Sequence, residues 1–296
     1  MGTGRMGLPM AERLAAAGVD LTAWNRTKSK AEPLREKGAR VVDRLQDLAG
    51  LDVVFVMVSG SQDLADVALG EDGLLKGRPP GILVDLSTVS TEVSALVRAG
   101  AADAGCEFLA GAVSGSPTVV RAGGLGIVAS GSREVFESVR PYFEVIGRTA
   151  VYAGPGEVAR LVKLCHNLHL AAVIQSLAEV TVLAEKGGVA RSAFLQFLNG
   201  SSMGSRFTGH KAPALVHLDF RPLFTMRLLR KDLDLGLTEA RQREVPMPLT
   251  ALVHQIVQAA VGEGYGEKDF AALLEVAARG AGLALGPEDV EVGDGL

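Results

Sequence analysis

Hydrophobic and polar positions follow two different patterns along this chain, and they change over near its middle. From Gly7 to about Ser130, short apolar or β-branched runs bounded by turn residues alternate with stretches of helical periodicity. The runs predict strands at 20–24, 52–58, 81–87 and 125–130. Strands that alternate with helices are typical of an α/β domain, so we expect a doubly wound parallel sheet with helices on both faces.

The second half has the periodicity of helices alone. Residues 157–186 form an apolar, Ala-rich stretch that contains neither Pro nor Gly and ends at Gly187 and Gly188, which predicts one long helix with a glycine cap. Further helices are expected at 191–199, 228–244, 248–264 and 269–281. We therefore predict a first domain at 1–154, an all-α domain at 155–284 joined through the long helix, and an acidic tail at 285–296 that frays.

Composition narrows the classes of partner. A chain of 296 residues usually forms two domains, and its net charge of −4, without basic runs, argues against nucleic acid as a partner. No apolar run reaches the ~18 residues of a membrane helix, and the N-terminus lacks a signal pattern, so we expect no membrane association and a cytoplasmic protein. Cys106 and Cys165 lack metal-ligand spacing, so we expect no metal site and two buried thiols.

A glycine fingerprint opens the chain. Gly2, Gly4 and Gly7 form G-x-G-x-x-G ahead of a helical pattern, where they serve a tight turn, the approach of pyrophosphate and close helix packing. This predicts a Rossmann-like dinucleotide-binding domain. The turn normally follows a strand, yet only Met1 precedes it; we expect Met1 to be an internal methionine and the gene to encode roughly five to ten more residues as an apolar strand. The alternative is a real truncation that rearrangement or oligomer contacts tolerate.

The segment after the next predicted strand indicates the type of dinucleotide. Asn25 stands where an NAD-selective site would place an acidic residue, and Arg26, Thr27 and Lys30 offer two positive charges and a hydroxyl. A guanidinium pairs well with a 2′-phosphate, so we predict NADP(H) as the preferred cofactor and NAD(H) as a possible one. The alternative is a solvated basic helix start.

The long helix carries the second set of polar residues. Lys163, His166 and Asn167 stand at i, i+3 and i+4 and therefore share a helix face between apolar neighbours. A lysine partly removed from water can move a proton, and an amide one turn on can orient it or a substrate hydroxyl. The alternative is an exposed polar stripe.

Two shorter segments complete the candidate chemistry. Ser114, Gly115 and Ser116 form a small-residue turn that can offer N–H and hydroxyl donors to an anion, although an ordinary β-turn would read the same way. Lys231 and Asp232 lie in a predicted helix, where a solvated charge pair is the default interpretation.

Together these segments resemble the β-hydroxyacid dehydrogenase family, which includes 3-hydroxyisobutyrate dehydrogenases and tartronate semialdehyde reductases. The resemblance runs through "GTGRMGLPMAERLAAAG", "VDLSTVS", "VSGSPTVVRAGGLGI", "KLCHN" and "RKDLDLGL" in that order. It implies an NAD(P)-dependent oxidoreductase that transfers a hydride between the cofactor and a short β-hydroxyacid or semialdehyde. The implied residues are, for catalysis, Lys163 as acid/base with Asn167; for substrate, Ser114, Gly115, Ser116 and His166; and for cofactor, Gly2, Gly4, Arg5, Met6, Gly7, Asn25, Arg26, Thr27, Lys30, Val58, Thr88 and Lys231.

The chain departs from the family pattern at three places. Ala110, Gly111 and Ala112 replace the usual Asp-Ala-Pro, Ala159 replaces a glycine, and His166-Asn167 replaces a pair of asparagines. The His-Asn pair is similar to that of 6-phosphogluconate dehydrogenases. That activity, an imine reductase activity and a non-catalytic NADP-binding scaffold are the alternatives, although imine reductases generally lack a lysine at this position.

The resemblance leaves the substrate unnamed. The pocket for its side chain is expected to draw on Met203, Phe207 and Phe224 of the helical domain. The apolar helices of that domain should also bury surface against a second copy, so we expect a homodimer or homotetramer.

Overall fold

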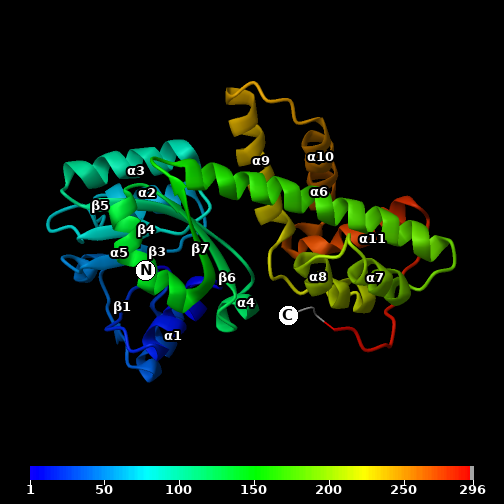
Figure 1. The fold of residues 1–296 in the computed structure, drawn as a ribbon, viewed down its shortest axis with the longest axis horizontal. Coiled ribbons are helices and arrows are strands. Elements are labelled where there is room, and N and C mark those ends of the chain that lie inside the picture. Colours follow the sequence, from blue (N-terminus) through cyan, green and yellow to red (C-terminus); the bar gives the residue numbers. More distant parts are fainter. Residues whose placement is uncertain (294–296) are drawn as a thin grey trace. The chain divides into compact units, whose positions relative to one another are not determined.

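The computed structural model describes residues 1–293 and divides the chain into two compact units, Met1–Lys163 and one that begins at Leu164 (Figure 1). The boundary lies within helix α6 (Val158–Lys186), later than the predicted position at residue 154. The start of α6 belongs to the first unit because the Ser130 hydroxyl accepts a hydrogen bond from the Ala159 N–H at 3.0 Å and donates one to the Gly156 carbonyl at 2.8 Å.

The first unit is built on a five-stranded sheet in the order β3-β4-β5-β6-β7, beside a separate pair β1-β2. Neighbouring strands are parallel, as predicted, except β5 and β6, which are antiparallel. The connection between them, residues 115–124, is too short for the crossover that parallel strands need. The strands are β1 (Thr22–Ala23), β2 (Arg40–Val41), β3 (Val53–Val56), β4 (Ile82–Asp85), β5 (Glu107–Ser114), β6 (Leu125–Ser130) and β7 (Gly147–Gly154).

Helices cover both faces of this sheet, as predicted. Leu83 packs in a cluster with residues of α2 and α3, whereas the next residue, Val84, packs in a cluster with residues of α1 and α5. Alternation of this kind follows from the period of two along a strand, and it makes both faces apolar. The helical segments are α1 (Gly7–Ala16), η1 (Lys28–Lys30), η2 (Glu32–Lys37), η3 (Leu45–Leu48), α2 (Ser61–Leu69), α3 (Thr91–Asp103), α4 (Pro117–Arg121) and α5 (Arg133–Ile146).

The position between β1 and β3, where a strand is expected before the glycine fingerprint, is occupied by the first two residues. The Met1 amino group donates to the Phe55 carbonyl at 2.7 Å, and the Met57 N–H donates to the Met1 carbonyl at 3.1 Å. On the other side, the Gly2 N–H donates to the Trp24 carbonyl at 3.1 Å. The proposed upstream strand stays a prediction.

The second unit is helical and has its own core. The later part of α6 packs with α7 (Arg191–Gly200), α8 (Arg206–His217), α9 (Met226–Gln242), α10 (Pro248–Gly262) and α11 (Leu273–Gly280), with short turns η4 (Tyr265–Glu267) and η5 (Phe270–Ala272). Gly236 lets α9 approach α6 closely, because a Cβ there would lie 2.5 Å from a methyl of Leu168.

The tail at 285–293 is packed against the second unit, contrary to the prediction that it frays. The Glu288 carboxylate accepts from the Arg191 N–H at 2.7 Å and the Ser192 N–H at 3.1 Å, and the Glu288 N–H donates to the Val216 carbonyl at 3.1 Å. Burial raises the pKa of Glu288, but these hydrogen bonds and the Arg191 charge outweigh it and lower the pKa. Leu285 packs on the core, and the rest of the predicted tail, 294–296, lies outside the described residues.

Among residues 1–293, one helix, α6, is long and apolar enough to cross a membrane by length and composition alone. This corrects the expectation that no segment reaches that length. The core helix of a soluble protein passes the same test, and half of the most apolar part of α6 is buried inside the protein, so the finding is weak evidence for a membrane span.

Candidate active site

The glycine turn has the geometry that a dinucleotide requires. Gly2 has a φ of +82°, and a Cβ on Gly7 would lie 1.9 Å from the Gly2 carbonyl oxygen, so both positions exclude a side chain. A Cβ on Gly4 would meet no protein atom within 4 Å, which leaves open space above the N-terminus of α1. That space and the unpaired N–H groups of a helix start suit pyrophosphate. Arg5 is exposed beside the turn, and Met6 is the residue before α1.

Asn25 connects this turn to the end of β1. Its side-chain oxygen accepts from the Thr3 N–H at 2.9 Å, and its amide nitrogen donates to the Thr27 carbonyl at 2.8 Å. Arg26 is 81% exposed and pairs with Asp63 at 3.0 Å, while Lys30 is exposed in the next segment. The predicted basic residues Arg26 and Lys30 therefore lie at the surface next to the fingerprint. The loop is held by Asn25, at the position where an NAD-selective site would have an acidic residue.

The carboxyl ends of β3 and β4 lie beside each other and carry two more predicted residues. The Val58 N–H donates to the Ser87 hydroxyl at 2.9 Å, and the Ser87 N–H donates to the Asp85 carboxylate at 3.1 Å. Thr88, half-buried, follows directly. The Met57 N–H also donates a hydrogen bond to the Met1 carbonyl, which places the glycine turn next to the end of β3. The structure therefore brings Gly2, Val58 and Thr88 to one edge of the first unit.

The Ser114–Ser116 turn lies where β5 ends and α4 begins. Gly115 has a φ of +148°, which favours glycine, and a Cβ there would lie 2.9 Å from a Val119 methyl. The Ser116 hydroxyl caps α4 by accepting from the Val119 N–H at 3.3 Å. The turn is thus a helix-capping turn whose Ser116 hydroxyl keeps its own proton for a hydrogen bond to another acceptor.

On α6, the predicted catalytic residues fall on either side of the unit boundary. Lys163 is the last residue of the first unit and is half-buried, while Asn167 belongs to the second unit and is 3% exposed. Within the second unit, the Asn167 amide nitrogen donates to the Asp232 carboxylate, and its oxygen lies 2.9 Å from Nδ1 of the exposed His166. Both polar ends of Asn167 are therefore held, which fixes its orientation.

Asp232 joins the candidate site through its hydrogen bond from Asn167, and its burial contradicts the interpretation of Lys231 and Asp232 as a solvated pair. Asp232 is 1% exposed, and its second oxygen forms no hydrogen bond but lies 3.2 Å from the Lys231 Nζ. A usable signal was present, since Asp232 shares the buried face of α9 with Leu229 and Leu233.

The residues expected to line the substrate side-chain pocket have different environments. Phe207 and Phe224 are partly buried and pack against the core of the second unit. Phe207 stacks on Phe270 with ring centroids 6.2 Å apart, and Phe224 lies edge-on to it with centroids 5.7 Å apart. Met203 is 73% exposed.

The two cysteines also differ. Burial raises the pKa of the Cys106 thiol to about 11, as expected for a buried thiol. Cys165 is exposed, so the prediction that both are buried is wrong for Cys165. Within residues 1–293, no group of three or more His, Cys, Asp or Glu side chains is arranged to hold a metal ion.

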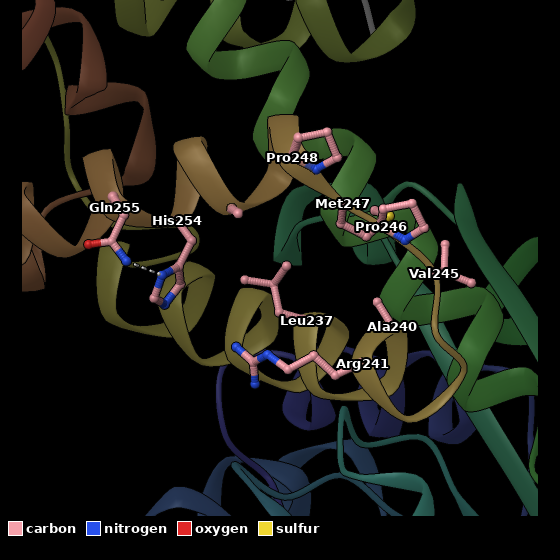
Figure 2. Close-up of a pocket in the computed structure, with 10 residues that line it drawn as sticks. Leu237, Ala240, Arg241, Val245, Pro246, Met247, Pro248, His254 and Gln255 are labelled. Atoms are coloured by element: carbon pink, nitrogen blue, oxygen red, sulfur yellow. Dashed lines mark hydrogen bonds between the residues drawn. The ribbon is translucent and has the colours of Figure 1, made fainter.

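A cavity of about 520 Å³ lies in the second unit between α9, α10 and the loop that joins them (Figure 2). His254 projects from α10, and its Nε2 donates a hydrogen bond to the Asp234 carboxylate of α9 at 2.7 Å. The cavity contains none of the predicted site residues; its lining is Leu237, Ala240, Arg241, Val245, Pro246, Met247, Pro248, Ala251, His254 and Gln255.

Comparison with known proteins decides the family. Residues 1–154 match the model of the NAD binding domain of 6-phosphogluconate dehydrogenase, and residues 158–277 match the model of the NAD-binding domain of NADP-dependent 3-hydroxyisobutyrate dehydrogenase. The chain belongs to the β-hydroxyacid dehydrogenase family. Both models describe NAD-binding domains of dehydrogenases, and the open glycine turn fits a nicotinamide cofactor.

Individual relatives agree with the family. The chain is 30% identical to glyoxylate/succinic semialdehyde reductase 2 of Arabidopsis thaliana over 93% of this chain and 77% of the relative. It is 30% identical to an NAD-dependent L-serine dehydrogenase of Pseudomonas aeruginosa over 93% of this chain and 96% of the relative. Among solved structures, a Mycobacterium tuberculosis 3-hydroxyisobutyrate dehydrogenase with L-serine matches with a TM-score of 0.82 at 25% identity, covering 93% of this chain and 96% of the other.

Proposed function

We propose that this protein is an NADP-linked reductase and dehydrogenase of a short β-hydroxyacid and its semialdehyde, with Lys163 as the acid/base. The observation that carries the proposal is the fixed Asn167 amide one helical turn beyond Lys163, held by the buried Asp232. A buried, oriented amide next to a lysine on one helix face suits a substrate hydroxyl that gains and loses a proton. Relatives named as semialdehyde reductases and as 2-(hydroxymethyl)glutarate dehydrogenase support this substrate class.

NADP preference rests on the end of β1. No carboxylate stands at residue 25 to accept a hydrogen bond from a ribose 2′-hydroxyl, since Asn25 is engaged with the backbone of Thr3 and Thr27. Arg26 is paired with Asp63 at the surface, where such a pair contributes little, so the guanidinium is free to exchange Asp63 for a 2′-phosphate.

The reaction needs one hydride and one proton. A bound nicotinamide cofactor supplies the hydride to the carbonyl carbon. The turn at Ser114–Ser116 holds the substrate carboxylate, with the Ser116 proton available for it. Lys163 gives its proton to the carbonyl oxygen as that oxygen gains negative charge, and in the reverse direction a neutral Lys163 takes the proton from the alcohol.

Two alternatives concern other activities of similar folds. Solved imine reductases match with TM-scores of 0.57 to 0.64 at 19–23% identity, below the 0.82 of the 3-hydroxyisobutyrate dehydrogenase, so they show the fold alone. A 6-phosphogluconate dehydrogenase activity is favoured only by the first domain model and by His166-Asn167.

A non-catalytic scaffold is the third alternative. The chain is 28% identical to a relative from Gallus gallus named a cytokine-like nuclear factor, over 92% of this chain and 50% of that protein. Lys163 and Asn167 argue for catalysis, and turnover decides between the two functions.

The test is a screen for cofactor turnover over C3–C5 hydroxyacids and semialdehydes with NADPH and NADH, followed by Lys163→Ala. We expect the variant to keep its cofactor affinity and to lose about 10²–10⁴-fold in kcat, the usual contribution of a general acid/base. Lys186→Ala at the other end of α6 is the matched control and should keep its kcat. Near-normal turnover by Lys163→Ala would overturn the mechanism, and no turnover of any substrate would favour the scaffold.

We also propose that the protein works in the cytoplasm as a homodimer or homotetramer, with a small hydroxyacid or semialdehyde as its ligand. The negative net charge of −4 and the absence of basic runs in the sequence support a partner other than nucleic acid.

A further inference from the structure

Arg160 is a fully buried charge in the first turn of α6. It is 1% exposed, and its Nη2 pairs with the Asp85 carboxylate at 2.5 Å. Its Nε donates to the Ser94 hydroxyl at 3.0 Å, and its Nη1 donates to the carbonyls of Ser87, at 2.8 Å, and of Gly111. All of these groups lie within the first unit.

These partners belong to the elements that carry the candidate site. Asp85 is the last residue of β4, and Ser87 directly precedes Thr88. The Ser87 hydroxyl also accepts a hydrogen bond from the N–H of Val58, which follows β3. Gly111 lies in β5, which ends at Ser114. One guanidinium thus ties the start of α6 to the end of β4, to the interior of β5 and, through Ser87, to the segment after β3.

Arg160 does not bind substrate itself. Four of the five N–H groups of its guanidinium are already used in hydrogen bonds to protein oxygens, and the side chain is closed off from solvent. Lys163 is three residues further along the helix, and therefore one turn away on the same face.

Stability alone does not explain a charge at this position. Removing a guanidinium and a carboxylate from water is costly, and an apolar pair of similar volume often stabilises a fold as well or better. The Arg160 guanidinium instead supplies directional hydrogen bonds to four acceptors, at Asp85, Ser87, Ser94 and Gly111, and such bonds fix distance and angle as apolar packing does not.

We propose that Arg160, through Asp85, is a positioning residue that holds Lys163 at a fixed distance from Thr88 and Ser114. The inference rests on the proposed function, because it gives Lys163 the catalytic role. A second clamp supports the same helix start: Glu157 accepts from the Arg98 Nε at 2.5 Å and from the Ser94 hydroxyl. Loss of Arg160 leaves that clamp in place, so the helix should form but sit less firmly on the strand ends.

The test compares Arg160→Gln with Arg160→Lys. With the substrate found in the screen, we expect Arg160→Gln to lower kcat by about 10–100-fold, since small misplacements of reacting groups have effects of this size. The NADPH dissociation constant should change by less than about threefold. The kinetic isotope effect with 4-deuterated NADPH should rise, because hydride transfer becomes slower than product release. Arg160→Lys can still pair with Asp85 but lacks the planar guanidinium, so its kcat should lie between those of Arg160→Gln and the natural sequence.

A readout without cofactor or turnover accompanies the kinetics. In the free protein, amide hydrogen exchange in residues 158–165 should be faster in Arg160→Gln than in the natural sequence. Arg191→Gln is the matched control, because Arg191 is another arginine with no exposed surface and with carboxylate partners, but it lies in the second unit. It should lower Tm while leaving kcat per cofactor-binding site, the isotope effect and exchange in 158–165 unchanged.

The outcomes separate this inference from the proposed function. If Lys163→Ala lacks activity but Arg160→Gln keeps the natural kcat, isotope effect and exchange, the positioning role is wrong and the function stands. If Lys163→Ala stays active, the proposed function fails first. If Arg160→Gln does not fold, Arg160→Lys decides by the same criteria. Equal kcat loss in Arg160→Gln and Arg191→Gln, without a change in isotope effect, would show a purely structural role.

Discussion

The proposed preference for NADP(H) rests on single residues that follow β1. Asn25 fixes the loop through the Thr3 N–H and the Thr27 carbonyl and leaves the charge of this region to Arg26 and Lys30. Asn25 and Arg26 could be identified from the sequence because they follow a predicted strand at a fixed distance from the glycine turn. The pairing of Arg26 with Asp63 of α2 could not, since it joins residues 37 apart in the chain.

Arg26→Ala is therefore expected to weaken the binding of NADPH much more than the binding of NADH, because the charge-assisted hydrogen bond forms only with the 2′-phosphate. Dissociation constants from cofactor fluorescence give the ratio for each form. Arg44→Ala, which removes another exposed arginine paired with an aspartate, is the control and should leave the ratio unchanged. An equal loss for both cofactors would mean that Arg26 is only a surface residue.

The two thiols should react at very different rates. Cys106 is buried and its pKa is raised to about 11, so at pH 8 it is almost wholly protonated and shielded. Cys165 is exposed on α6. A disulfide reagent at pH 8 should label one thiol per chain rapidly and the second only on unfolding, and Cys165→Ser should remove the fast phase. Rapid labelling of both thiols in the folded protein would contradict the burial of Cys106.

The sequence could not predict the polar residues of the candidate site that pair across long distances in the chain. Lys163 and Asn167 follow from their spacing on one helix, and the glycines from a local motif. Arg160 and Asp85 stand 75 residues apart and Asn167 and Asp232 stand 65 apart, and each pair becomes visible only when two elements meet.

At the scale of elements, strong local patterns were predicted correctly and weak ones were missed. The strands near 20–24, 52–58, 81–87 and 125–130 and the long helix are all present. β5 was missed because its Ala110-Gly111-Ala112 core lacks β-branched side chains. α8 was missed because Gly209 and Pro213 lie inside it, and tertiary packing overrides their poor helix propensity.

The glycine turn offers a test of how an element binds its ligand. Because a Cβ on Gly4 meets no protein atom within 4 Å, Gly4→Ala should leave the Tm of the free protein nearly unchanged. The added methyl occupies the space meant for pyrophosphate, so NADPH affinity should fall by at least about tenfold. Gly7→Ala is the contrasting variant: its Cβ would lie 1.9 Å from the Gly2 carbonyl oxygen, and it should lower Tm without cofactor. Normal NADPH affinity in Gly4→Ala would place the pyrophosphate elsewhere.

At the scale of the whole molecule, the existence of two units was predictable and their boundary was not. The change from alternating strands and helices to helices alone is visible in the sequence. The first turn of α6 nevertheless belongs to the first unit, because Ala159 and Arg160 form hydrogen bonds with residues of its strands. The tail at 285–293 is held in the same way by Arg191 and Glu288, whose pairing local hydropathy does not reveal.

The surface of the second unit carries most of the exposed large apolar side chains among the described residues. Leu183, Phe197 and Met203 are 73%, 76% and 73% exposed, and Leu249 and Leu252 of α10 are 62% and 60% exposed. Single exposed apolar residues are normal, but a concentration of them on one unit indicates burial against another chain.

We therefore expect a dimer or tetramer by light scattering at micromolar concentration, formed through the helical unit. Replacing Leu183 and Phe197 by Ser should lower the assembly mass or make it depend on concentration, because each removes apolar area from the interface. Leu96→Ser, which changes an exposed leucine of α3 in the first unit, should leave the mass unchanged. A monomer at micromolar concentration would contradict the prediction. A stable oligomer that tolerates the helical-unit substitutions and responds to Leu96→Ser would move the interface to the first unit.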